Sequence, residues 1–136
     1  ERSDVMSVVH AHPPLSTAFS ICRRPLAQHY LTETISGLGE VPVAPFALPG
    51  SQGVADSVAP FCRDYRALLL EYHGAVTWGT DLWSAFDRME TVEHTAKILL
   101  HVRQLGGGVP LTEEEVAQLK GLDGFYRQRR GRRQKA

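Results

Sequence analysis

The sequence predicts a layered α/β fold, and three of its features lead to that prediction. The 136 residues include 43% hydrophobic and 22% charged side chains, a composition close to that of globular proteins. Two continuously apolar segments, 66–72 and 75–79, are typical of strands that are buried on both faces of a sheet. Segments with helical spacing alternate with about four strands in all, and this alternation favours helices packed against one sheet.

The first half of the chain is expected to contain short elements. Helices are predicted over 15–21, 29–36 and 51–61, and strands over 5–10 and 41–44. The β-branched, apolar segment 5–10 indicates a buried strand that ends before two prolines. Pro14 is compatible with the first turn of the helix that follows. Apolar side chains recur at helical spacing over 51–61, which predicts the third helix.

The second half is expected to contain two buried strands and the longest helix. Strands are predicted over 66–72 and 75–79, and helices over 81–105 and 112–119. Thr80 is predicted to cap the long helix, whose apolar stripe comprises Leu82, Phe86, Met89, Val92, Ala96 and Leu99. The three glycines 106–108 end this helix. Thr112 and Glu115 have the spacing of a capping box at the start of the last helix.

Charge is distributed unevenly, although 15 basic and 15 acidic side chains balance to a net charge of zero. The end of the chain holds six basic side chains and no acidic one: Arg127, Arg129, Arg130, Arg132, Arg133 and Lys135. The remaining nine basic residues face 15 acidic ones, so the rest of the chain carries about −6. We expect residues 123–136 to form a solvated basic tail. Because aromatic side chains do not alternate with the basic ones, nucleic acid is not the expected partner.

The composition also excludes several classes of protein. No apolar run approaches the ~20 residues of a membrane-spanning helix, and the first residues do not match the basic start and apolar centre of a signal peptide. Cys22 and Cys62 are too few for a disulfide scaffold, and neither belongs to a CxxC pair. We therefore expect a cytoplasmic protein that is not bound to a membrane.

Three of the six histidines lie at the ends of predicted strands. His10 and His12 lie at the end of the first strand, and because side chains alternate along a strand, both imidazoles project from the same face. His73 ends another strand and is followed by Gly74, which permits a close approach of the backbone. Three neutral imidazoles match a zinc site that keeps a position open for water or substrate. The alternative is that these histidines only form hydrogen bonds with the backbone at strand ends.

Other metal sites are not expected. His94 and His101 lie seven residues apart on the predicted long helix, beside charged residues, which is typical of a solvated helix face. A structural zinc domain is not expected either, because closed structural sites usually have four ligands that include cysteine. The histidines at the strand ends are therefore the candidates for a functional metal site.

Two segments resemble the sequence signatures of the class II aldolase/adducin family. The segment 8–18, VVHAHPPLSTA, resembles the zinc-binding signature of that family. The segment 68–79, LLLEYHGAVTWG, resembles its second signature, in the same order and at a similar separation. The resemblance implies a three-layer α/β/α sandwich of the class II aldolase type over residues 1–122. It also implies a homotetramer with active sites between neighbouring subunits.

The same resemblance implies a function in carbohydrate metabolism and a set of site residues. His10, His12 and His73 would be the ligands of Zn²⁺, or of another divalent metal such as Mn²⁺ or Co²⁺. Tyr30, supplied across a subunit boundary, and Tyr126 would be catalytic, with packing as the alternative role of either ring. The implied activity is that of a lyase like L-fuculose-phosphate aldolase, which cleaves a small-molecule sugar phosphate, a ketose phosphate, to dihydroxyacetone phosphate and an aldehyde. The alternatives are a sugar-phosphate 4-epimerase, a dehydratase or a decarboxylase of the same family, and a non-catalytic adducin-like interaction module.

One part of the family pattern is not found in the sequence. In the family, a catalytic acid/base glutamate and glycine- and serine-rich phosphate loops precede the His-x-His strand by tens of residues. The chain begins nine residues before His10, so we expect that the N-terminal part of the family domain is missing from it. A fragment is the interpretation that we favour, and a degenerate, non-catalytic relative is the alternative.

Overall fold

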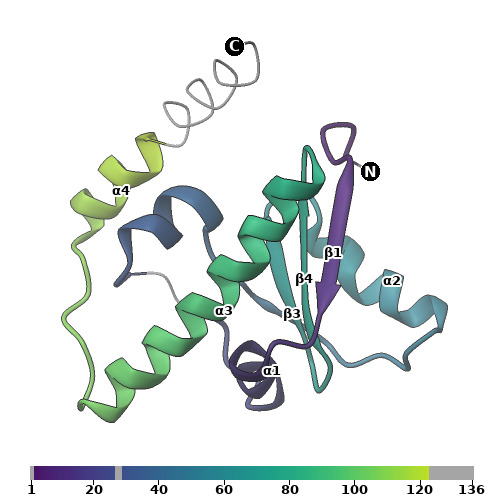
Figure 1. Cartoon of the computed structure of the whole chain (residues 1–136), viewed down its shortest axis with the longest axis horizontal. Helices are drawn as coiled ribbons and strands as arrows, with labels where there is room; N and C mark the ends of the chain where they lie inside the picture. The colour runs from purple at the N-terminus through teal and green to yellow at the C-terminus, as the bar shows by residue number, and fades with distance from the viewer. Residues whose placement is uncertain (1, 27–28, 123–136) are drawn as a thin grey trace.

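Four strands form one mixed sheet in the computed structural model, which describes residues 2–26 and 29–122 (Figure 1). The strands are β1 (Ser7–Ala11), β2 (Val43–Ala44), β3 (Ala67–Leu70) and β4 (Gly74–Gly79). Their order across the sheet is β1-β4-β3-β2. β4 is antiparallel to both of its neighbours, whereas β2 pairs in parallel with β3. The predicted strands are confirmed, with shorter bounds for most of them.

Two helices, α1 (Pro14–Ile21) and α3 (Leu82–Gln104), cover one face of the sheet (Figure 1). Because side chains alternate along a strand, Leu69 of β3 and Ala75 of β4 point into this layer. The helices contribute Phe19, Met89, Val92, Ala96 and Leu99 to the same core cluster. This packing holds α1 directly behind the end of β1, where the first two predicted ligands lie.

The opposite face of the sheet is covered by α2 (Gln52–Val58) and the 3₁₀ turn that follows it (Ala59–Phe61). Leu68, Leu70 and Trp78 point to this side, where Val58 and Phe61 pack against them. Helical segments therefore lie on both faces of one sheet (Figure 1). This is the three-layer α/β/α arrangement that the family resemblance implies.

The remaining helical segments pack on the outer side of α3. A π-helical turn, η1 (Thr34–Leu38), contacts α3, and α4 (Glu113–Gly121) contacts η1. The buried hydroxyl groups of Thr34 and Thr95 share a hydrogen bond of 2.9 Å, which joins η1 to α3. α4 begins with the predicted capping box: the Thr112 hydroxyl accepts from the Glu115 N–H, and the Glu115 carboxylate accepts from the Thr112 N–H.

Two helices begin elsewhere than predicted. The residue that caps α3 is Asp81 rather than Thr80, because Asp81 Oδ1 accepts a hydrogen bond of 2.7 Å from the Ser84 N–H. The helix expected over 29–36 is shifted along the chain, because helical turns form only from residue 32 onward and continue as η1. Both differences depend on local hydrogen bonding that apolar spacing does not report.

Two segments that were expected to be buried are partly exposed. Leu82 and Phe86 are 61% and 44% exposed, because the first turns of α3 bury Ala85 instead. β1 is only half-buried, since it is the outer strand of the sheet and Val8, on the side of α2, is 60% exposed. The strand predicted over 5–10 therefore forms at about the predicted position, but the prediction that it is buried is wrong.

Two expectations concern the chain as a whole. The basic tail predicted over 123–136, with Tyr126, lies outside the described residues and stays a prediction. Within the part of the chain that the structure describes, no helix combines the length and the apolar composition needed to cross a membrane. The described part therefore provides no membrane-spanning helix.

Candidate metal centre

The first two predicted ligands lie on and just after β1. His10 points away from the core under α1 and α3, as Val8 does, because the two residues are on the same side of the strand. His12 continues this alternation one residue beyond β1 and directly precedes Pro13, the N-cap of α1. The centroids of the two imidazole rings are 4.9 Å apart. The predicted projection of both rings to one side is confirmed.

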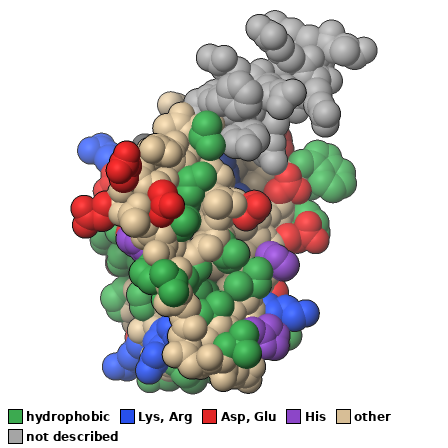
Figure 2. All heavy atoms as spheres, turned by 90° about the vertical axis from the view of Figure 1, so that its left-hand side faces the viewer, with side chains coloured by type: hydrophobic (Ala, Val, Ile, Leu, Met, Phe, Trp, Pro, Cys, Tyr) green, Lys and Arg blue, Asp and Glu red, His purple; other side chains and the backbone are tan. Residues whose placement is uncertain are grey.

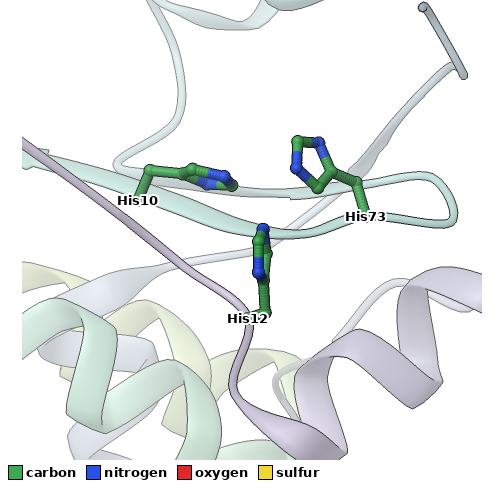
Figure 3. A group of neighbouring side chains, drawn as sticks. All are labelled: His10, His12 and His73. Carbon is green, nitrogen blue, oxygen red and sulfur yellow. The ribbon is translucent and has the colours of Figure 1, made fainter. Parts of the chain in front are cut away.

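The third predicted ligand lies on the tight turn between β3 and β4. The His73 N–H donates a hydrogen bond of 3.0 Å to the Leu70 carbonyl oxygen, which closes the turn. The centroid of the His73 ring is 4.8 Å from the centroids of both His10 and His12. Figure 3 shows the three rings pointing toward one another from two separate segments of the chain. One nitrogen from each ring lies within 4.8 Å of the others, so a single ion can contact all three.

Gly74 permits this close approach. The antiparallel register pairs Ala11 with Ala75, which places Gly74 beside His12. A Cβ atom at Gly74 would lie 2.6 Å from His12 Cδ2 and 2.5 Å from the Ala11 carbonyl oxygen. Carbon and oxygen atoms do not come so close, so a side chain here would push His12 and the end of β1 away from the turn. The His-Gly pair in the sequence therefore has a steric reason.

A backbone carbonyl group orients the ring of His10. His10 Nδ1 lies 2.9 Å from the carbonyl oxygen of Ala75. Because a carbonyl oxygen only accepts hydrogen bonds, this contact places the proton on Nδ1 and leaves Nε2 with a free lone pair. Histidines that ligate metals commonly have their second nitrogen bound in this way. The residues of the site therefore fit a metal ion in donor chemistry and in orientation.

The environment of His73 favours its neutral form. Burial lowers the pKa of His73 below its ordinary value of 6.5, and repulsion from His10 and His12 lowers the pKa further. A metal binds only the neutral imidazole, because a proton occupies the same nitrogen. His73 is therefore available to a metal at a lower pH than an ordinary histidine.

The three histidines can hold one divalent ion and leave part of its coordination sphere open. Among the described residues, no cysteine, aspartate or glutamate joins this group. Zinc sites with three protein ligands keep a position for water or substrate, whereas closed structural sites have four. Hydrogen bonding to the backbone at strand ends explains one nitrogen of His10 but not the convergence of three rings. The arrangement is that of an open site.

The other residues singled out in the sequence lie elsewhere. Tyr30 is 37% exposed, and its ring lies against Gly108, beyond the C-terminal end of α3. Tyr126 is outside the described residues, so the catalytic roles of both tyrosines stay predictions. His94 and His101 are exposed on α3, as expected for a solvated face.

Sequence reasoning missed a carboxylate that caps α1, the helix that begins two residues after His12. Glu93 of α3 accepts hydrogen bonds from the Leu15 N–H (2.9 Å), the Ser16 N–H (2.8 Å) and the Ser16 hydroxyl (2.9 Å). These N–H groups belong to the first turn of α1, where Pro13 at the N-cap offers no side-chain acceptor. Because the side chain of proline at the N-cap cannot accept these hydrogen bonds, the sequence indicates that another residue must do so. It does not indicate which distant residue supplies the acceptor.

Comparisons with known proteins agree with this geometry. The family model described as Class II Aldolase and Adducin N-terminal domain matches residues 1–100. The chain belongs to the class II aldolase/adducin family. It is 33% identical over 119 residues to an L-fuculose phosphate aldolase of Haemophilus influenzae, which covers 87% of this chain and 55% of that protein. It is 34% identical over 122 residues to a 3-oxo-tetronate 4-phosphate decarboxylase of Escherichia coli K12, which covers 84% of this chain and 55% of that protein.

A solved structure supports the same relationship. An L-fuculose 1-phosphate aldolase superposes on this chain with a TM-score of 0.79 and 31% sequence identity. The superposition covers 88% of this chain and 56% of the aldolase chain. The predicted family and fold are therefore confirmed. The chain spans a little over half the length of the curated relatives that it matches.

Proposed function

We propose that this chain supplies the metal centre of a lyase that cleaves a ketose phosphate, by an aldol reaction, to dihydroxyacetone phosphate and an aldehyde. The observation that carries the proposal is the convergence of His10, His12 and His73 in a chain whose relatives include L-fuculose phosphate aldolases. Zn²⁺ is the expected metal, and Mn²⁺ or Co²⁺ would also suit imidazole ligands.

Each residue of the centre has a distinct part in this proposal. When bound, the metal would act as a Lewis acid toward the carbonyl group of the substrate. The Ala75 carbonyl orients the ring of His10, the β3–β4 turn sets the backbone of His73, and the N-cap of α1 at Pro13 directly follows His12. These elements would bring the three ligands together before substrate arrives. Fixed ligands avoid reorganisation during the reaction.

Proton transfer requires groups outside the three histidines. In the proposal, the Tyr30 hydroxyl of a neighbouring subunit donates a proton to the oxygen of the departing aldehyde, and Tyr126 closes over the substrate. This arrangement requires an oligomer with active sites between subunits, and a homotetramer is the expected form. The exposure of Tyr30 (37%) is compatible with a role toward a neighbouring chain.

A second candidate reaction is the decarboxylation of a 3-oxo acid phosphate. The match to the 3-oxo-tetronate 4-phosphate decarboxylase is as long and as similar as the match to the aldolase. Both reactions break a carbon–carbon bond next to a carbonyl group, and both gain from a Lewis acid at that carbonyl oxygen. The choice between them therefore depends on the substrate and not on the three histidines.

The test is an assay of the natural polypeptide that contains this sequence, purified and loaded with zinc. With L-fuculose 1-phosphate, we expect release of dihydroxyacetone phosphate, measured through its NADH-dependent reduction by a coupling enzyme. His73→Ala should lower this activity more than about 100-fold, whereas His94→Ala, an exposed histidine on α3, should retain it.

Other outcomes would contradict the aldolase proposal. Release of CO₂ from 3-oxo-tetronate 4-phosphate, without cleavage of a ketose phosphate, would favour the decarboxylase. Inversion at C4 of a pentulose phosphate would favour a 4-epimerase. A metal-loaded protein that acts on none of these substrates would favour the adducin-like interaction module.

A further inference from the structure

Glu71, two residues before His73, connects three segments of the chain. Its side chain is only 11% exposed. Oε2 accepts a hydrogen bond of 2.7 Å from the Phe46 N–H, which lies between β2 and α2. Oε1 forms an ion pair with Nε of Arg23, just after α1. One carboxylate therefore ties the β3–β4 turn to α1 and to the segment before α2.

The partner of Glu71 has an unusual backbone conformation. Arg23 follows the C-cap of α1 with φ of +52°, and the N–H groups of Arg23 and Arg24 donate to Ser20 and Phe19. This is the Schellman arrangement that usually ends with glycine, because a side chain in the left-handed region costs free energy. The chain has arginine at this costly position, and its side chain forms the ion pair with Glu71.

The same contact includes a second residue in the left-handed region. Tyr72 has φ of +58°, and the Arg23 guanidinium lies over its ring, 5.5 Å from the centroid. Arg23 and Tyr72 are the two non-glycine residues with positive φ among those that the structure describes. They touch each other across the Glu71 ion pair, directly beside His73. Surrounding contacts must hold such conformations in place.

α1 links the two segments that carry the metal ligands. At its N-terminal end, two residues after His12, it is bound by the Glu93 carboxylate. At its C-terminal end, Arg23 binds Glu71, two residues before His73. The helix is thus fixed by a carboxylate at each end, and each attachment lies beside one ligand.

We infer that Arg23 and Glu71 are positioning residues of the metal centre: their ion pair locks the β3–β4 turn to α1 and so sets the position of His73 relative to His12. The inference rests on the proposed function, because it requires that the three histidines bind a metal. Outer contacts that orient metal ligands typically change metal affinity by about 10- to 100-fold when removed. A tenfold loss is therefore the expected scale.

The experiment is a titration of the full chain with Co²⁺, whose absorption spectrum reports both affinity and ligand geometry. We expect Glu71→Gln and Arg23→Met each to weaken Co²⁺ binding about tenfold and to change the spectrum. The double variant should be no weaker than either single variant, because both remove the same interaction. Arg23→Lys, which keeps a cation for Glu71, should recover part of the affinity. Asp4→Asn, which breaks the separate Arg2–Asp4 pair, is the matched control and should bind as the wild type does.

Arg23→Met separates positioning from simple charge effects. Removal of a nearby positive charge would by itself strengthen the binding of a cation, whereas loss of positioning weakens it. Thermal melting of each variant, followed by circular dichroism, ensures that affinity is measured on folded protein. Co²⁺ affinities of Glu71→Gln and Arg23→Met within twofold of the wild type, or tighter binding by Arg23→Met, would overturn this inference alone. A wild-type chain that binds no Co²⁺ would overturn the proposed function and this inference with it.

Discussion

Two groups of histidines are similar in the sequence and different in the structure. His10 and His12 share one face of a strand, because side chains two residues apart point to the same side. His94 and His101 share one face of a helix, because seven residues are close to two helical turns. The first two rings meet His73 at centroid distances of 4.8 to 4.9 Å. The second pair is two helical turns apart, roughly 10 Å along the axis, and exposed.

The surroundings of the two groups differ as much as the distances. Figure 2, which views the side where α4 and the end of α3 lie, shows histidine side chains as separate patches among acidic and basic groups. The strand-end rings instead converge, with one nitrogen of His10 bound to a backbone carbonyl. A shared face is therefore not enough for a metal site: ligands must come from segments that meet, and their rings must be oriented.

The largest expected effect is the loss of metal binding when one strand-end ring is removed. His73→Ala should weaken the binding of Co²⁺ to the chain by more than about 100-fold, since even outer contacts of metal ligands account for 10- to 100-fold. His94→Ala and His101→Ala should leave the affinity unchanged. Titration by absorption spectroscopy measures all three. An equal loss in the helix variants would remove the distinction between the two groups.

The next effect tests the close approach that brings the strand-end rings together. Gly74→Ala places a Cβ atom against His12 and the Ala11 carbonyl oxygen, so it should destabilise the fold by about 2–3 kcal/mol and weaken metal binding. Gly121→Ala, at the end of α4 with nothing near its Cβ position, is the matched control and should be neutral or slightly stabilising. Urea unfolding measures the free energies. A Gly74→Ala variant as stable as the control would show that the approach is not required.

A gain of binding would sharpen the comparison on the helix. Glu90→His places an exposed histidine four residues before His94, so that two imidazoles lie one turn apart. We expect a weak second site, seen as additional Co²⁺ binding at least about 100-fold weaker than that of the strand-end site, because only two ligands are present. Isothermal titration calorimetry measures it in a His73→Ala background. Affinity equal to that of the strand-end site would contradict the importance of the third ring.

The smallest effect concerns the acid stability of the metal-free chain. The folded-state pKa of His73 is below the ordinary 6.5, so the unfolded chain binds more protons as the pH falls through that value. The free energy of unfolding should therefore decrease between about pH 7 and pH 5, and His73→Ala should show a smaller decrease. Urea unfolding at the two pH values measures this difference. The same pH dependence in the wild type and in His73→Ala would contradict the assigned environment of His73.

The site was predictable from sequence where local rules apply. Strand alternation places His10 and His12 on one side, and the strand end places His73, so the grouping of the three rings follows from period and position. Their assignment as metal ligands comes from the family resemblance. A close approach at Gly74 was expected, but its partner His12 was not predicted, and neither were the Glu93 cap of α1 and the Glu71–Arg23 pair. Each joins residues far apart along the chain, and no local spacing contains that information.

The fold, like the site, was predictable where it depends on local spacing and not where it depends on contacts between distant segments. The order and type of the strands and of α1, α2, α3 and α4 follow from apolar spacing and from turn residues. The burial of β1 does not, because exposure of Val8 depends on which strands flank it in the sheet. The cap at Asp81 in place of Thr80 differs by one residue, where two neighbouring side chains are both suitable caps.

Zinc X-ray absorption spectroscopy of the chain loaded with one equivalent of Zn²⁺ tests the convergence of the three imidazoles most directly. We expect a spectrum of three imidazole nitrogens at about 2.0–2.1 Å, completed by oxygen, and two imidazoles in His73→Ala. Zinc bound through sulfur at about 2.3 Å, or through one imidazole or none, would contradict the account.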